Sequence, residues 1–221
     1  IIQISNQQKK VAITYSSAES KLAAEILYSY LEKSLPNTFE IKDKNITKSD
    51  AQIILEIQKN NKELKDQEFI LKSNSQDISL LATNLKSLKY AVYTLLEKWE
   101  FRKFTATVSY IPKPDAFIFP KNFYQKYQPT FAYRTLLYPD SYDQAFREWH
   151  KLDWFNDDFG LWGHTFDRLV PPKTHFKTNP KLYALYEGKR RAESLCMTND
   201  TVVELLCSEL KKVIAEKPNA R

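Results

Sequence analysis

The chain has 221 residues, of which 43% are hydrophobic and 27% charged, a composition typical of globular proteins and unlike that of disordered ones. Its formal net charge of +6 comes from 33 basic and 27 acidic side chains that are interspersed. This indicates a solvated, lysine-rich surface and argues against a nucleic-acid site, which needs basic residues gathered on one face. No apolar run approaches the roughly 18 to 20 residues that span a bilayer, so we expect no transmembrane segment.

The N-terminus lacks the charged n-region and the long apolar h-region of a signal peptide. If the protein is exported, we expect its signal to have been removed already, and we leave open a lipid anchor upstream of the first residue. Cys196 and Cys207 belong to no CxxC or Cys/His ligand spacing. We therefore predict no metal and no cofactor. Whether the two cysteines pair stays open, with two buried thiols as the favoured interpretation.

Residues 1–119 alternate between short strands and two helices. A strand at Val11–Tyr15 precedes a helix that Pro36 ends, and Ser16 with Glu19 forms a candidate capping box at its start. Asn84 is the expected N-cap of the second helix, whose apolar spacing places Trp99 in the core. Further strands are expected at 39–41, 53–57, 68–72, 78–81, 108–111 and 117–119. This order predicts an α+β domain, a mixed sheet with two helices on one face.

Residues 120–130 have a proline at each end and aromatic residues between, which indicates an ordered connector. Residues 131–221 form the second predicted domain. Its expected elements are a strand at 131–138, a helix at 142–151 and a strand at 159–164, the opening of a parallel βαβ repeat. A long helix from about Asn199 should follow, with an inward face of Val202, Val203, Leu206, Leu210, Val213 and Ile214.

The run Asn156–Thr165 is the most informative part of the second domain. It contains two of the three glycines and reads as a buried strand that ends in Trp162 and His164. Because ligands bind at the carboxyl ends of parallel strands, we expect a ligand at this tip. Asp157 and Asp158 precede the strand, so a cap or turn role is expected for them.

Two sets of residues resemble known families. The segments Leu88–Trp99, Arg102, Tyr110–Pro112 and Pro129–Arg134 resemble the N-terminal domain of α-glucuronidases and β-hexosaminidases running into the first barrel strand. The second half is similar to an uncharacterised bacterial glycoside-hydrolase-like family, a domain of unknown function that joins such a domain to a (β/α)₈ barrel. That similarity rests on residues 156–166, 179–185, 188–190 and 195–199.

The resemblance implies three substrate-binding residues. Arg134 matches the arginine that ends the first barrel strand in β-hexosaminidases, where a guanidinium fork suits sugar hydroxyls or a uronate carboxylate. Trp162 would stack on a sugar ring and His164 would donate to a hydroxyl. The alternatives left open are an interdomain ion pair for Arg134, a core position for Trp162 and a buried structural role for His164. Lys189 and Arg190 are better explained as a solvated turn after Gly188.

A complete (β/α)₈ barrel takes about 250 residues, so the chain is expected to hold only the beginning of one. The acid/base carboxylates of a glycosidase would then lie beyond this chain, and no catalytic residue is assigned. The resemblance implies part of an exported glycoside hydrolase acting on complex glycans, located in the periplasm, at the cell surface or outside the cell. The alternative is a non-catalytic carbohydrate-binding or surface-scaffold protein with a degenerate barrel. The sugar, the stereochemical outcome and the oligomeric state stay open.

Overall fold

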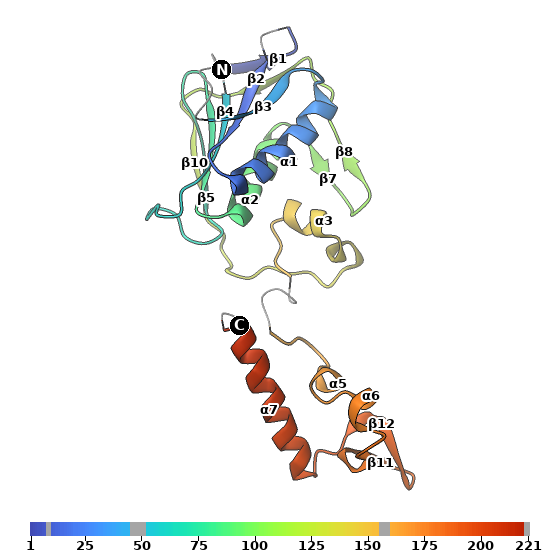
Figure 1. Cartoon of the computed structure of the whole chain (residues 1–221). Coiled ribbons are helices and arrows are strands. Elements are labelled where there is room, and N and C mark those ends of the chain that lie inside the picture. Colours follow the sequence, from blue (N-terminus) through green and yellow to red (C-terminus); the bar gives the residue numbers. More distant parts are fainter. Residues whose placement is uncertain (8–9, 45–51, 155–159, 219–221) are drawn as a thin grey trace. The chain divides into compact units, whose positions relative to one another are not determined.

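The computed structural model describes residues 1–7, 10–44, 52–154 and 160–218. The chain forms two compact units, Ile1–Leu152 and Asp153–Arg221 (Figure 1). Each unit has a buried apolar cluster of its own. The predicted division into a domain at 1–119, a connector at 120–130 and a second domain at 131–221 stays a prediction. None of the helices in the described ranges combines the length and the apolar character that crossing a bilayer requires.

The first unit is built on a six-stranded mixed sheet, which confirms the predicted α+β class. From edge to edge the strands are β10 (Tyr124–Tyr127), β5 (Phe69–Ser73), β6 (Ile78–Ala82), β4 (Gln52–Ile57), β2 (Val11–Tyr15) and β3 (Phe39–Asp43). The pairs β2 with β3, β2 with β4 and β4 with β6 are parallel. The predicted hairpin of β5 and β6 is antiparallel, as is the pair of β10 with β5.

Two helices pack against this sheet and against each other, α1 (Ala18–Ser34) and α2 (Leu85–Lys98). Figure 1 shows both on the same side of the sheet. Asn84 caps α2 as predicted, its side chain accepting the Ser87 N–H at 2.9 Å. The cap of α1 lies one residue later than expected, because Ser17 and Ser20 exchange the capping-box bonds instead of Ser16 and Glu19.

Aromatic residues fill the core beside a two-stranded ribbon of β1 (Ile2–Ser5) and β9 (Ala116–Phe119). Trp99 is buried as predicted, stacks on Phe117 at a centroid distance of 4.7 Å and donates its indole N–H to the Ile118 carbonyl. A short pair, β7 (Arg102–Lys103) and β8 (Ser109–Tyr110), lies between α2 and β9 in the sequence. The expected strand at 108–111 is thus reduced to two residues.

The segment after β10 differs from the prediction. Residues 131–138 form no strand, because no strand in the described part of the chain pairs with them. A 3₁₀ turn, η1 (Pro139–Tyr142), leads into α3 (Gln144–Trp149), a shorter version of the predicted helix. Trp149 is fully buried against Tyr30 and Tyr93, with ring centroids 5.5 and 5.2 Å away. Glu148 accepts from Lys89 of α2 at 2.8 Å.

The second unit consists of short elements and one long helix. They are α5 (Phe166–Leu169), α6 (Pro172–His175), η2 (Pro180–Leu182), β11 (Tyr183–Tyr186), β12 (Lys189–Leu195) and α7 (Asp200–Glu216). β11 and β12 pair antiparallel, and the turn between them, Glu187–Gly188, has positive φ at both residues, as a type I′ hairpin requires. Of the predicted strand at 159–164, Phe159 lies outside the described residues, as do Asp157 and Asp158. Residues 160–164 form bends, so a strand there is wrong.

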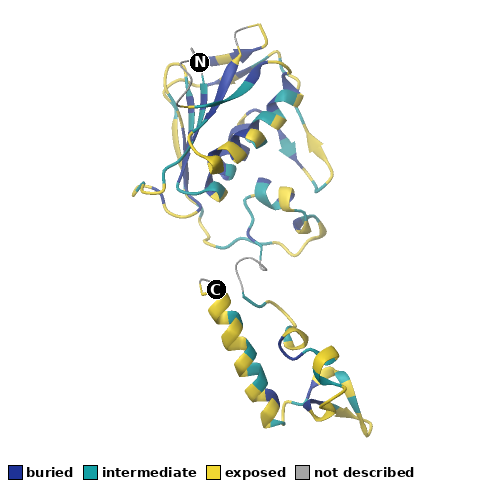
Figure 2. Ribbon diagram, in the orientation of Figure 1, coloured by how far each residue is buried: buried dark blue, intermediate teal, exposed yellow. Residues whose placement is uncertain are grey.

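Two further expectations about this unit are corrected. The small apolar cluster touches one side of α7, so of the six predicted inward residues only Val202 is fully buried, whereas Val203, Leu210 and Ile214 are exposed. Figure 2 shows that most of this helix is exposed. The interpretation of Cys196 and Cys207 as buried thiols is also wrong, since Cys207 is exposed and Cys196 only half-buried. Neither forms a disulfide.

Candidate functional site

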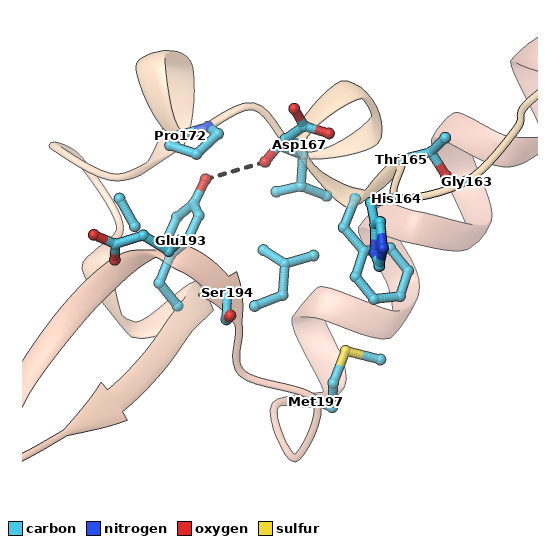
Figure 3. Close-up of a pocket in the computed structure, with 13 residues that line it drawn as sticks. Gly163, His164, Thr165, Asp167, Pro172, Glu193, Ser194 and Met197 are labelled. Carbon is cyan, nitrogen blue, oxygen red and sulfur yellow. Dashed lines mark hydrogen bonds between the residues drawn. The ribbon is translucent and has the colours of Figure 1, made fainter. Parts of the chain in front are cut away.

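A pocket of about 700 Å³ lies within the second unit (Figure 3). Its size falls within the range of small-ligand sites, about 300 to 1,000 Å³. Four segments form it: the bend before α5 together with α5, the start of α6, the start of β11, and the end of β12. The lining residues are 163–167, Val170, Pro172, Tyr183, 192–195 and Met197.

Buried apolar residues support the pocket from below. Tyr183, Val170 and Leu195 line the pocket and belong to the core cluster of this unit. The Tyr183 hydroxyl donates to the Val170 carbonyl at 3.2 Å, and its ring meets Phe176 edge-on with centroids 5.1 Å apart. Burial raises the pKa of Tyr183, so its hydroxyl stays a neutral donor. The floor is therefore apolar and held in place by a hydrogen bond between two elements.

Polar side chains form the rim. His164 lies in the bend, Asp167 on α5, and Glu193 and Ser194 near the end of β12. Figure 3 shows Asp167 and Glu193 on different walls, with His164 on the side opposite Glu193. All four side chains are exposed, so they reach a ligand without a desolvation penalty of the kind that burial imposes.

The bend that carries His164 depends on Gly163. Its φ of +74° lies in the left-handed region, where residues with a Cβ are strained. A Cβ at this position would meet nothing within 4 Å, so backbone conformation and not lack of space favours glycine here. The prediction that this glycine-containing run ends in a ligand site was based on a strand that does not form.

The three predicted site residues fall in different places. His164 lines the pocket. Trp162, two residues earlier, is 42% exposed and is not among the lining residues. Because neither side chain is buried, a core position for Trp162 and a buried structural role for His164 are both wrong.

Arg134 belongs to the first unit, where it holds loop segments together. Its guanidinium donates to the Lys151 carbonyl at 2.9 Å, the Phe131 carbonyl at 2.6 Å and the Gln67 side chain at 2.5 Å. The Gln67 amide in turn donates to the Ala132 carbonyl at 3.0 Å. Convergence of Arg134 with Trp162 and His164 at one rim involves both units and stays a prediction.

Sequence reasoning missed Asp167, Glu193, Ser194 and Tyr183. Asp167 follows Phe166 on the four-residue helix α5, and Glu193 stands just after the basic run Lys189–Arg191, so neither carries a local signal of a site. Only the tertiary structure brings residues of α5 and of β12 to one cavity. Within residues 1–7, 10–44, 52–154 and 160–218, no group of three His, Cys, Asp or Glu side chains could hold a metal ion.

The family of the chain is shown by its sequence. The domain of unknown function DUF4838 matches residues 103–221, more than half of the chain and all of the pocket. The chain belongs to the DUF4838 family. This confirms the part of the expected resemblance that concerned a domain of unknown function. The α-glucuronidase-type character of the N-terminal domain stays a prediction. None of the curated proteins matches this DUF4838 chain.

Several solved structures show similarity to this DUF4838 chain. One is a family GH115 4-O-methyl-α-glucuronidase with specificity for decorated arabinogalactans, with a TM-score of 0.44, 18% identity, and coverage of 61% of this chain and 19% of the enzyme. Another is a GH138 enzyme targeting pectin rhamnogalacturonan II, with a TM-score of 0.33, 11% identity and coverage of 42% and 10%. A third is an inactive mutant of a GH20 exo-β-N-acetylglucosaminidase from Vibrio harveyi, with a TM-score of 0.33, 18% identity and coverage of 49% and 15%. The chain thus spans less than a fifth of each of these enzymes.

Proposed function

We propose that the pocket of the second unit binds carbohydrate and that the protein is part of an exported glycoside hydrolase acting on complex glycans. In this proposal the pocket positions the substrate. The observation that carries it is the combination of an apolar floor with a rim of exposed acceptors and donors in a cavity of about 700 Å³. Export and convergence of the pocket with Arg134 belong to the same proposal and rest on the sequence resemblance alone.

The chemistry of the lining suits a sugar ring. A pyranose has apolar C–H faces and a rim of hydroxyls, each of which can both donate and accept. Asp167 and Glu193 supply carboxylate acceptors, while Ser194 supplies a hydroxyl that donates or accepts. The half-exposed ring of Phe166 offers a surface for the apolar face. This combination of an apolar wall with a few placed polar groups is typical of small-ligand sites.

No catalytic residue is assigned. Glycoside hydrolysis requires two carboxyl functions on either side of the scissile bond, or one acid assisted by the substrate. The pocket holds two carboxylates, and its proposed contribution is to bind and orient hydroxyls. Binding without turnover would favour the alternative function, a carbohydrate-binding or surface-scaffold protein.

In the experiment, the purified chain is titrated with a panel of neutral, acidic and amino oligosaccharides. Binding is measured by calorimetry and by NMR of the pocket amides. We expect at least one glycan to shift the amides of residues 163–167 and 192–195. His164→Ala should weaken that binding several-fold, because it removes one rim hydrogen bond worth about 0.5 to 1.5 kcal/mol. His175→Ala is the matched control, since His175 lies in the same unit and does not line the pocket. A folded protein whose pocket amides respond to no glycan would contradict the proposal.

A further inference from the structure

The long helix α7 has two apolar stripes, and only one of them packs inside the second unit. The stripe that packs against the apolar cluster of this unit consists of Val202, Leu205, Leu206 and Val213. The other, which we call the outer stripe, consists of Val203, Cys207, Leu210 and Ile214. Its three aliphatic side chains are 41 to 60% exposed, and its cysteine is exposed as well. The described residues of the chain therefore leave the outer stripe open to solvent.

The spacing of the outer stripe is that of a coiled-coil seam. Its residues follow one another at intervals of four, three and four. At these intervals all of them fall within an arc of about 60° on the helix surface. They correspond to the a and d positions through which two helices pack side by side, and a reduced cysteine serves there as a small apolar residue. An exposed apolar row with this spacing indicates another helix as its partner.

The outer stripe is complementary to a second copy of itself. In an antiparallel pair, Cys207 lies opposite the second copy's Leu210, and the same register sets Val203 opposite the second copy's Ile214. A two-fold axis repeats both contacts, so all four residues of each stripe are matched. In each contact a smaller side chain faces a larger one, which lets the two helices approach evenly along the seam.

Charges beside the outer stripe favour the antiparallel arrangement over a parallel one. Glu204 and Lys211 are exposed and flank the stripe on the same side. In the antiparallel register, Glu204 comes beside the second copy's Lys211, and the two-fold axis makes this pair occur twice. In a parallel pair the same two charges would lie beside Asn199 and Leu206 of the other helix, neither of which is charged.

We propose that α7 is a dimerisation helix, and that two copies of this chain associate through the outer stripe in an antiparallel pair. The inference is independent of the proposed glycan site, because none of the four stripe residues lines the pocket. A single pair of 17-residue helices, about 26 Å long, lies at the small end of specific interfaces, so the expected Kd is on the order of 10 to 100 µM.

The first test is sedimentation equilibrium of the full chain from about 5 to 500 µM, at 150 mM salt and with a reducing agent that keeps Cys207 from crosslinking. Leu210→Glu should weaken the dimer at least about ten-fold, because it sets a charge into the apolar seam at two symmetric places. Leu185→Glu is the matched control, since Leu185 belongs to β11 of the same unit and is 60% exposed. It should leave the Kd unchanged, and circular dichroism confirms that both variants stay folded.

Reversal of the flanking charges tests the partner and its direction. Glu204→Lys and Lys211→Glu should each weaken the dimer by about five- to twenty-fold, because two attractive pairs become repulsive. A chain with both changes should regain the native Kd. An equimolar mixture of the two single variants should form a heterodimer of near-native affinity, because each contact then joins opposite charges again.

Every result decides the inference. A chain that stays monomeric at 500 µM would refute it, and so would a dimer that Leu210→Glu leaves intact, because its contact must lie elsewhere. A dimer that Leu210→Glu disrupts, but that the double charge reversal fails to restore, would overturn the antiparallel pairing and with it the proposal. Loss in the Leu185→Glu control as well would show general apolar association in place of a seam on α7.

Discussion

The hydroxyl of Tyr183, the first residue of β11, donates a hydrogen bond to the carbonyl of Val170, the residue after α5, across 3.2 Å. This bond joins two walls of the pocket beneath its opening. Both residues are about 1% exposed and belong to the core cluster of the second unit. The shape of the pocket therefore depends on the same interactions that stabilise the unit.

Tyr183→Phe should lower the stability of the second unit by about 1 kcal/mol, because the Val170 carbonyl loses its buried donor while the ring still fills its place. Hydrogen exchange of β11 and β12 amides measures this change. Tyr186→Phe, on the exposed end of the same strand, is the control and should have no measurable effect. Unchanged protection in Tyr183→Phe would show that the bond contributes little.

The hairpin turn allows two substitutions with opposite effects. Gly188 has a φ of +72°, so Gly188→Ala should destabilise the hairpin by about 1 kcal/mol through backbone strain. Glu187 has a φ of 48°, a conformation that asparagine adopts more readily, so Glu187→Asn should raise stability by a few tenths of a kcal/mol. Thermal unfolding of the three proteins compares them directly. Two changes of the same sign would contradict the type I′ assignment.

Trp149 packs α3 against the rest of the first unit. Trp149→Ala should lower the free energy of unfolding by about 3 to 5 kcal/mol, because it removes a fully buried side chain packed between Tyr30 and Tyr93. Trp162→Ala, a change of the same size at a side chain that is 42% exposed, should cost far less. Urea denaturation, monitored by circular dichroism, measures the loss of stability in both variants. Similar losses from the two variants would refute the packing role of α3.

Glu68 makes the stability of the first unit depend on pH. Burial by itself raises the pKa of this carboxyl, but the Lys65 backbone N–H at 2.9 Å and the Lys126 ammonium at 3.0 Å outweigh it, so the pKa is lowered from its usual 4.5. A lowered folded-state pKa means that the ionised form stabilises the protein above pH 4.5 and that this contribution is lost as pH falls through the folded-state value.

Glu68→Gln should therefore be less stable than the native protein at pH 7, and the difference should shrink as pH falls below about 4. Urea midpoints at pH 7, 5, 4 and 3 provide the measurement. Glu63→Gln, at an exposed glutamate on the same loop, serves as the control. A constant difference at all four pH values would show that packing of Glu68, and not its charge, is responsible.

Much of the first unit could be predicted because its signals are local. The short apolar runs of β2, β4, β5 and β6, the apolar stripes of α1 and α2, and the cap at Asn84 are each signals contained in one element. Trp99, the residue after α2, could be placed in the core by its spacing from the apolar residues of that helix. The strand at 131–138 failed because a strand needs a neighbour with which to pair, and no residue within the segment specifies one.

In the second unit the sequence determined which residues are polar or aromatic around position 163 and that Asn199 begins a long helix. His164 could be nominated from this alone. Tertiary structure alone decided that Asp167, Glu193 and Tyr183 share its cavity, and that α7 leaves Val203, Leu210 and Ile214 exposed. The physical reason is range: caps, turns and periodicity act over a few residues, whereas a pocket and a buried face exist only where segments distant in the chain pack together.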